Sequence, residues 1–278
     1  MNNYLSYSGR YSYILCPKKY EYCYIKRLKV KSNPKDVMFG SVIGKIFEWF
    51  YNKKLWSYPQ STILSLIEPA LDEISVQEGF NIRQTDPEFV KKLIEELNTY
   101  TISTIETIKS HGFLTSNSRS EIDLTTDYYS PKYDMKIRLG GRVDFIHYKD
   151  GESWILDGKG SKYRERYVDS EQLIWYAVQH YILYHMAPTR LGFIFFKFPE
   201  DPVKWIEYDD DSIRKSIDTT FSIMKKIHLS IFPANPSSGC RMCGYTSKCE
   251  EGTKFLAARK VETGGRVDVD SFFGLDPV

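Results

Sequence analysis

The chain has 278 residues and a net charge of +2, and its residues are 42% apolar, 27% charged and 15% aromatic. This composition excludes an intrinsically disordered chain and allows a sizeable hydrophobic core in one large domain or two small ones. No run approaches the roughly 18 apolar residues of a membrane span, and the first residues lack the apolar region of a signal peptide. We therefore expect a folded, cytoplasmic protein without a membrane partner.

The first 35 residues differ in charge from the rest of the chain. They contain eight Lys and Arg residues and one acid, a net charge of +7, together with seven tyrosines. Basic side chains neutralise phosphates and aromatic rings stack on bases, so this segment favours contact with nucleic acid. An equally supported interpretation is a basic helix over residues 10–27 whose tyrosines face the core.

Apolar residues at helical spacing predict three further helices, over residues 37–51, 63–74 and 89–108. Pro69 marks a kink or a new start in the second, and Asp86-Pro87 supplies an N-cap and a first-turn proline to the third. We assign residues 1–118 to the basic segment and a helical lobe beside the core.

From about residue 119 the apolar period changes from helix to strand. Strand-like segments lie at residues 121–125, 136–148, 153–157, 191–198 and 204–207. Residues 149–152 predict a hairpin turn, and a helix over about 169–184 predicts a βαβ crossover between the third and fourth strands. With a last helix over residues 213–227, residues 119–230 form an α/β core, a mixed sheet flanked by helices.

Two motifs near the middle of the chain place carboxylates at the ends of neighbouring strands: Gly141-Arg-Val-Asp144 and Asp157-Gly158-Lys159. Asp144 and Asp157 could jointly hold Mg²⁺ or Mn²⁺ through oxygen ligands, and the backbone carbonyl of Gly158 is free to approach the same ion. Lys159 lies on the same strand face as Asp157, where an ammonium group orients water or neutralises developing charge. Metal-dependent hydrolysis of phosphodiesters needs these groups.

Other polar residues could support this site. Gln172 and Tyr176 are four residues apart on a predicted helix, so their side chains lie on one face that could point into the site. Glu121 on the first core strand is a candidate outer ligand. The loop 162–166 is basic and aromatic and could grip a phosphate backbone, with a plain solvated loop as the alternative.

Cysteine spacing predicts a second site. Cys240-x-x-Cys243 places two thiolates on one tight turn, and Cys249 follows six residues later in a loop rich in Gly and Pro. Structural disulfides are not expected in a reducing compartment, so this trio favours zinc or an iron–sulfur cluster. Cys16 or Cys23 would supply the fourth thiolate. Residues 231–252 form this cysteine loop, and residues 253–278 a tail.

The order of these motifs resembles the PD-(D/E)XK nuclease superfamily, specifically its RecB-like branch with a four-cysteine iron–sulfur cluster. That branch includes the AddB nuclease domain and CRISPR-associated adaptation nucleases. The resemblance begins at Ser6-Tyr-Ser8 and Cys16-Pro-Lys-Lys-Tyr20, continues through Gly141-x-x-Asp144, Asp157-x-Lys159 and Gln172-x-x-x-Tyr176, and ends at the three downstream cysteines. It implies a restriction-endonuclease-like core.

The resemblance also implies roles for these residues. Asp144 and Asp157 would be metal ligands and Lys159 the catalytic lysine, while Gln172 and Tyr176 would support the site and contact DNA. A 4Fe–4S cluster would be ligated by four thiolates, those of Cys16, Cys240, Cys243 and Cys249. Cys23 would then be a spare thiol, and Zn²⁺ is the alternative metal.

One position departs from the family. A metal-binding His usually stands four residues after a Gly on an early helix, and here that position is Gly44. Glu48, one turn on, could substitute; the alternative for it is an ordinary surface carboxylate. Loss of this ligand would weaken metal binding or abolish cleavage.

We therefore expect a metal-dependent DNA nuclease, more an exonuclease on single-stranded or free DNA ends than an endonuclease. The alternative is a catalytically inactive DNA-binding or scaffold protein that keeps the fold and the cluster. The chain has no nucleotide-binding motif of a helicase, so unwinding would come from a helicase, recombination or replication partner.

Overall fold

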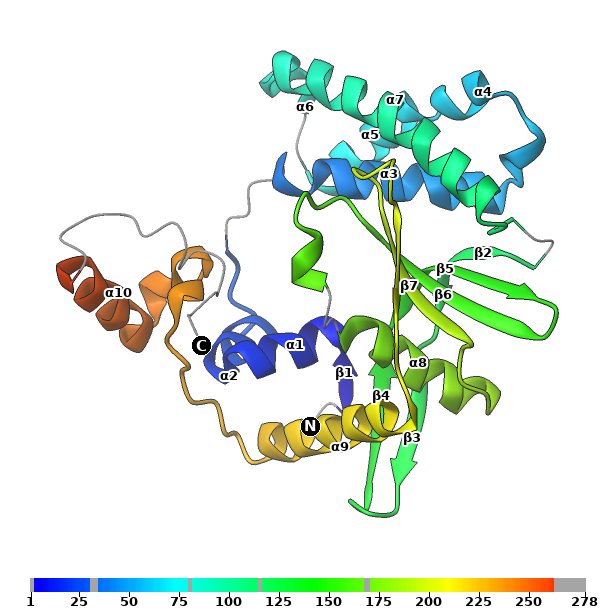
Figure 1. The fold of residues 1–278 in the computed structure, drawn as a ribbon. Helices are drawn as coiled ribbons and strands as arrows, with labels where there is room; N and C mark the ends of the chain where they lie inside the picture. The colour runs from blue at the N-terminus through cyan, green and yellow to red at the C-terminus, as the bar shows by residue number, and fades with distance from the viewer. Residues whose placement is uncertain (1–2, 31–34, 80–81, 115–116, 168–170, 263–278) are drawn as a thin grey trace. The chain divides into compact units, whose positions relative to one another are not determined.

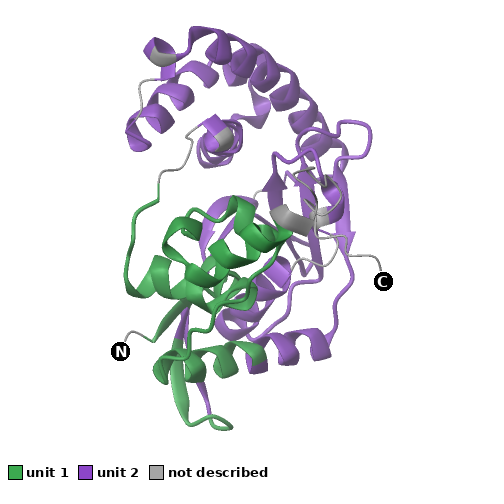
Figure 2. Ribbon diagram, turned by 90° about the vertical axis from the view of Figure 1, so that its left-hand side faces the viewer, with its two compact units in different colours: residues 1–32, 131–137, 219–278 green, residues 33–130, 138–218 purple. Residues whose placement is uncertain are grey.

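The computed structural model describes residues 3–30, 35–79, 82–114, 117–167 and 171–262. The chain forms two compact units (Figure 2). The first comprises residues 1–32, 131–137 and 219–278, and the second comprises residues 33–130 and 138–218. The chain passes between the units within strand β4 (Met135–Gly140) and within helix α9 (Asp210–His228).

A five-stranded mixed sheet of order β2-β5-β6-β7-β8 forms the centre of the second unit (Figure 1). Its strands are β2 (Arg119–Asp123), β5 (Arg142–Lys149), β6 (Glu152–Lys159), β7 (Arg190–Phe195) and β8 (Val203–Ile206). β6 and β7 are parallel, and the other neighbours are antiparallel. Helix α8 (Glu171–Tyr184) connects the parallel pair, which confirms the predicted crossover.

β5 and β6 form a hairpin. Lys149 pairs with Glu152 across the turn residues Asp150 and Gly151, whose φ angles are 51° and 82°. Asp and Gly tolerate this left-handed conformation better than most residues, so the sequence favours a two-residue turn here. The hairpin turn predicted at residues 149–152 is confirmed.

Helices precede the sheet in the second unit. They are α3 (Lys35–Asn52), α4 (Gln60–Leu64), α5 (Ile67–Gln77), α6 (Ile82–Thr85) and α7 (Pro87–Ser110). Asp86 caps α7 as predicted, since the backbone N–H of Phe89 donates to its Oδ1 at 3.0 Å. Pro69 lies in the first turn of α5, where its missing N–H removes no helical hydrogen bond.

Different helices cover the two faces of the sheet. Phe145 and Leu156 belong to one hydrophobic core that the sheet shares with α3, α5 and α7. Asp157, next to Leu156, faces the other side, because alternate residues of a strand face opposite sides, and Gln172 of α8 contacts it there. The carboxylate of Asp144 instead reaches the Gly158 N–H and lines a cavity beside α3. The helices of residues 35–110 therefore share one hydrophobic core with the sheet. The predicted boundary after residue 118 falls inside the second unit, which includes residues 33–130.

The first unit contains β1 (Tyr4–Ser6), α1 (Tyr7–Leu15), α2 (Pro17–Tyr20), a π-helix (Glu21–Ile25) and α10 (Glu250–Glu262). The helix predicted over residues 10–27 is confirmed as far as Ile25, with one interruption. Cys16 breaks it with an extended backbone, φ −163° and ψ 106°, because a residue before proline is pushed out of the helical region. Strand β3 (Thr126–Ser130) belongs to the second unit.

The tyrosines of residues 1–35 differ in burial. Tyr13 and Tyr20 are buried, and the Tyr13 hydroxyl donates to the carbonyl of Ile231 at 2.6 Å. Tyr4 and Tyr11 are exposed. The core interpretation therefore holds for the first pair, and the second pair remains on the surface.

Two further predictions need correction. The predicted strand 136–148 is two strands, because Gly141 separates β4 from β5: a Cβ on it would lie 2.0 Å from Oε1 of Gln179, so α8 presses directly on this point. The tail predicted from residue 253 is helical as far as Glu262, and residues 263–278 lie outside the described residues. None of the described helices is both long and apolar enough to span a bilayer.

Candidate active site

The β5–β6 hairpin places Asp144 and Asp157 opposite each other. Phe145 pairs with Leu156, and the next pair in this register is Asp144 with Asp157. Directly opposite residues on antiparallel strands carry their side chains on the same face. Oδ2 of Asp144 also accepts a hydrogen bond of 2.8 Å from the backbone N–H of Gly158, which ties the two strand ends together.

Glu121 continues this row of carboxylates on β2. The pairs Ser120–Phe145 and Ile122–Val143 flank it, so its register partner is Asp144. Glu121 has a φ of 53°, a left-handed conformation that is uncommon for a residue with a side chain. Asp144 thus has an acidic neighbour on each adjacent strand, Glu121 on β2 and Asp157 on β6, although these three carboxylates do not come close enough together in the described structure to hold one metal ion.

α8 joins the buried carboxylate to the lysine. Nε2 of Gln172 donates to Oδ1 of Asp157 at 2.8 Å, and Nζ of Lys159 donates to Oε1 of Gln172 at 2.8 Å. Nζ of Lys159 also lies 2.5 Å from Oδ2 of Asp157. The Tyr176 hydroxyl accepts from Gln172 at 2.9 Å and hydrogen-bonds Asp157. The structure thus brings together all four residues predicted here.

The site favours protonated carboxyl groups when no cation is bound. Loss of hydration, followed by the charge of Asp157, raises the pKa of Asp144 well above its ordinary value. Asp157 is only 2% exposed, and burial raises its pKa although Lys159 acts in the opposite direction. Burial also raises the pKa of Glu121, with a further contribution from Glu48. Such a group of acids lowers its energy by taking up protons or a cation.

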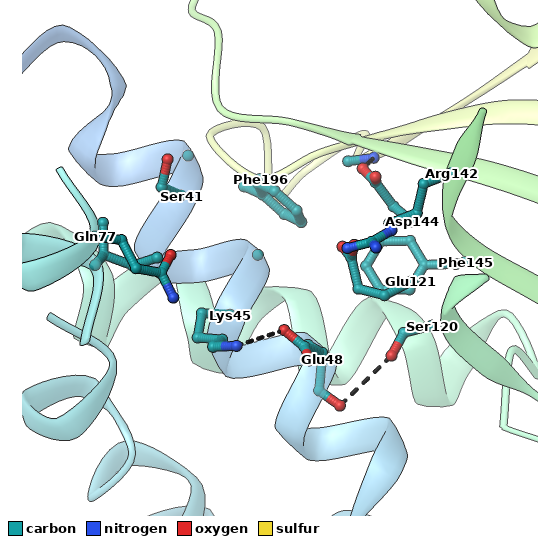
Figure 3. A pocket seen from close by; sticks show the side chains of 14 residues that line it. Ser41, Lys45, Glu48, Gln77, Ser120, Glu121, Arg142, Asp144, Phe145 and Phe196 are labelled. Atoms are coloured by element: carbon teal, nitrogen blue, oxygen red, sulfur yellow. Dashed lines mark hydrogen bonds and ion pairs between the residues drawn. The ribbon is translucent and has the colours of Figure 1, made fainter. Parts of the chain in front are cut away.

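A cavity of about 380 Å³ opens beside this row of carboxylates (Figure 3). Asp144, Gly158 and Glu121 line it from the sheet, and Gly44 and Glu48 line it from α3. A Cβ on Gly44 would meet nothing within 4 Å, so this position holds open space. Asp157, Lys159, Gln172 and Tyr176 do not line the cavity and form the network behind Asp144 and Gly158.

Glu48 is committed to a lysine that the sequence did not single out. Nζ of Lys45 lies 2.9 Å from Oε2 of Glu48 (Figure 3). It also lies 2.8 Å from Oε1 of Glu73. Lys45 and Glu48 are three residues apart on α3, and this spacing was the sequence signal for their ion pair. The contact with Glu73 of α5 depends on tertiary packing and had no sequence signal.

Phe196 is a second residue that sequence reasoning missed. It lines the cavity, and a Cβ on Gly158 would lie 2.4 Å from its ring. Glycine at 158 is therefore needed for the ring to close over the strand end. Phe196 lies just beyond β7, in an apolar run where nothing distinguishes it from a core residue.

The residues of the loop over 162–166 differ in how they are held. Arg164 pairs with Asp201 at 2.8 Å, and its guanidinium lies over the rings of Phe195 and Phe198, so it holds the loop in place. Lys162 and Tyr163 are exposed.

All four cysteines of the predicted set line one cavity of about 270 Å³ in the first unit. Three of their sulfur atoms accept backbone N–H hydrogen bonds of 3.4 Å each: Asn235 to Cys16, Ser237 to Cys240 and Gly252 to Cys249. Cys23 lines a different cavity, with Tyr20 and Tyr24. Within the described residues, no three His, Cys, Asp or Glu side chains converge closely enough to hold a single metal ion.

A family model, described as the PD-(D/E)XK nuclease superfamily, matches residues 4–250. The chain belongs to the PD-(D/E)XK nuclease superfamily. No curated protein matches the sequence. Among solved structures, this chain is similar to the crystal structure of SSO0001, with 14% sequence identity and a TM-score of 0.34. The match covers 88% of this chain and 98% of the SSO0001 chain. A second match is the crystal structure of protein VC1899 from Vibrio cholerae, with 11% sequence identity and a TM-score of 0.24. It covers 72% of this chain and 57% of the VC1899 chain.

Membership of the PD-(D/E)XK superfamily gives this mixed α/β fold a nuclease identity, consistent with a restriction-endonuclease-like core. The superfamily acts on DNA and typically uses Mg²⁺ or Mn²⁺. The matched range contains the hairpin carboxylates, Lys159 and the cysteine loop.

Proposed function

We propose that this superfamily member is an active, Mg²⁺- or Mn²⁺-dependent DNA exonuclease that acts on single-stranded ends. The observation that carries the proposal is the intact polar network: Asp157 and Lys159 are both held by one Gln172 side chain. A site without selection for chemistry would have no reason to retain a charged pair that is almost fully buried.

The donor set fits a hard divalent cation. Asp144 and Asp157 offer carboxylate oxygens from neighbouring strands, and burial raises the pKa of both, so a bound cation would stabilise their charged forms; Lys159 already compensates part of the charge of Asp157. We propose these two side chains as ligands, with the Gly158 carbonyl as a third and Glu121 at the outer side. When bound, the ion would polarise the scissile phosphate and activate a water molecule.

Lys159 would supply positive charge beside the reacting phosphate. Its ammonium is held between Gln172 and Asp157 and lies 5.1 Å from the ring centre of Tyr167, so its position is fixed before substrate arrives. A preorganised cation needs no rearrangement as negative charge develops on the phosphate oxygens. Tyr176 would keep the Gln172 amide oriented.

We also propose the RecB-like branch and a 4Fe–4S cluster on Cys16, Cys240, Cys243 and Cys249. Backbone N–H groups directed at three sulfur atoms stabilise thiolates, which are the form that binds metal. A four-iron cluster has several metal atoms and so bridges thiolates that do not converge on one point. Zn²⁺ on the same four thiolates remains the alternative metal, and the visible absorbance separates the two.

The rival proposal is an inactive DNA-binding or scaffold protein, and one observation favours it. Gly44 leaves an open space in the cavity where the family carries its His, and Lys45 neutralises Glu48, the nearest substitute. The intact Asp157–Lys159–Gln172 network favours the active enzyme.

Cleavage of labelled DNA separates the two proposals. We expect the anaerobically purified protein to degrade 5′- and 3′-labelled single strands in Mn²⁺, and Asp157→Ala to abolish this. The product ladder gives the polarity and distinguishes exonuclease from endonuclease action. Equal inertness of both proteins, with DNA binding retained, would establish the scaffold instead.

Gly44→His is expected to strengthen metal binding. The imidazole would occupy the open space beside Asp144, and one extra ligand should lower the Mn²⁺ concentration for half-maximal cleavage roughly tenfold, equivalent to about 1.4 kcal/mol. Gly44→Ala is the matched control, because it also replaces the helical glycine, with a gain of up to about 1 kcal/mol in helix propensity, but adds no ligand. Identical Mn²⁺ dependence in the two variants would rule out a metal at this position.

A further inference from the structure

A second cavity, of about 750 Å³, adjoins the active-site cavity in the same unit. Gly40 and Ser41 of α3 line both cavities. Gly160 and Ser161, which directly follow Lys159, line the second one. A Cβ on Gly160 would lie 2.8 Å from the Phe39 ring, so the end of β6 and the start of α3 are closely packed here. A chain leaving the active site would enter this cavity next.

Three lysines, Lys35, Lys92 and Lys197, line the second cavity. Nζ of Lys197 lies 4.1 Å from the ring centre of Phe39, and Nζ of Lys35 lies 5.5 Å from that of Phe89. Aromatic faces attract ammonium groups, so each ring helps to fix a lysine. The cavity thus combines ordered positive charges with aromatic surface.

These lysines differ in how far their charge is compensated. Lys35 forms an ion pair with Asp86, and Lys197 forms one with Glu96 at 2.8 Å. Lys92 is exposed and forms no ion pair with any residue that the structure describes. Lys92 is therefore the cation that is most available to an incoming anion.

We propose that this second cavity binds the phosphate backbone of a single DNA strand next to the scissile phosphate, with Lys92 as a principal phosphate contact. The proposal rests on the nuclease function proposed above and extends it to a strand-binding subsite. Phosphates are the anionic groups of the substrate, and the partly buried rings of Phe89 and Tyr167 line the cavity as aromatic surface for unpaired bases. The bases of a duplex are already stacked within a rod and cannot reach the rings that line this cavity, so we expect a single strand to make more contacts here than a duplex.

Lys91 provides a matched control for Lys92. The two residues are neighbours on α7, both are exposed, and Lys91 does not line either of the two cavities. Lys92→Gln and Lys91→Gln therefore remove the same charge from the same helix at two different places.

The test measures anisotropy of a short fluorescein-labelled single strand, and of its blunt duplex, over a series of salt concentrations in EDTA. We expect Lys92→Gln to weaken single-strand binding roughly three- to tenfold at low salt and to reduce the slope of log K against log salt by about 0.7. Lys91→Gln should match wild type, duplex binding should change less, and the melting temperatures should stay equal.

The outcome separates this proposal from the proposed function, because binding in EDTA needs no cleavage. A Lys92→Gln protein that binds the single strand like Lys91→Gln overturns the subsite, even if wild type degrades DNA. An equal loss for the single strand and the duplex overturns it too. A selective loss of single-strand binding supports the subsite, even in a protein that proves inert.

Discussion

Asp144→Asn is expected to abolish cleavage and, at the same time, to stabilise the metal-free protein. Asparagine keeps an oxygen that accepts from the Gly158 N–H but removes a negative charge from opposite Asp157. We expect a gain of about 0.5–2 kcal/mol in the free energy of unfolding, the usual size for a stabilising substitution, or a few degrees in melting temperature. Loss of a metal ligand worth several kcal/mol should reduce cleavage roughly a thousandfold.

The stability gain has a definite dependence on pH. Because the pKa of Asp144 is raised in the folded protein, folding favours the protonated form of this group. Its contribution to stability is present below the ordinary pKa of an aspartate and is lost as pH rises through the folded-state value. Asp144→Asn removes this loss, so the difference between variant and wild type should grow from acid to mildly alkaline pH.

Thermal melts in EDTA across this pH range check the prediction, and Mn²⁺ provides the control. Added Mn²⁺ should stabilise wild type, since it compensates the two carboxylates, and should stabilise the variant much less. A variant that melts below wild type in EDTA at neutral pH would show that the Asp144 charge is already compensated within the protein.

Cys240→Ala is expected to cause the largest loss of stability. A cluster that joins Cys16 to the loop at residues 240–249 closes most of the chain into one loop, and a cross-link over so long a loop contributes about 3–5 kcal/mol. Metal binding and folding of the first unit should therefore be coupled. The variant should lose visible absorbance together with stability.

Cys23→Ala is the control for this prediction. Cys23 lines a separate cavity and contacts Tyr245, so its loss should leave the visible spectrum unchanged. Urea unfolding and absorbance of anaerobically purified proteins test both variants. A Cys240→Ala protein that kept the wild-type spectrum would exclude this cysteine as a ligand, and a colourless but zinc-loaded wild type would establish the alternative metal.

The proximity of Asp144 and Asp157 could be predicted because the position of a hairpin turn determines which residues of the two strands lie opposite each other. A two-residue turn at Asp150-Gly151 pairs residues whose numbers are equally far from it, so Asp144 must meet Asp157. Turn chemistry is local and readable from sequence. The α8 residues Gln172 and Tyr176 followed equally well, from the four-residue spacing of one helix face.

What the sequence concealed depends on contacts between distant segments. Gly141 lies at the break between β4 and β5, where the side chain of Gln179 approaches too closely for any Cβ. Glu48 forms an ion pair with Lys45, which also pairs with Glu73 of another helix. The cavity shared by Lys35, Lys92 and Lys197 assembles residues from three separate segments of the chain. Periodicity within a segment carries no information about such neighbours.

The side chain of Gln172 restricts how this protein can change over evolution. Its amide presents an oxygen to the ammonium of Lys159 and a nitrogen to the carboxylate of Asp157, so it works as a polar connector with two unlike ends. A glutamate would repel the carboxylate and a lysine would repel the ammonium. Substitution of Gln172 by glutamate or lysine is therefore unfavourable. A charged residue could be accepted at this position only if Lys159 or Asp157 changed as well.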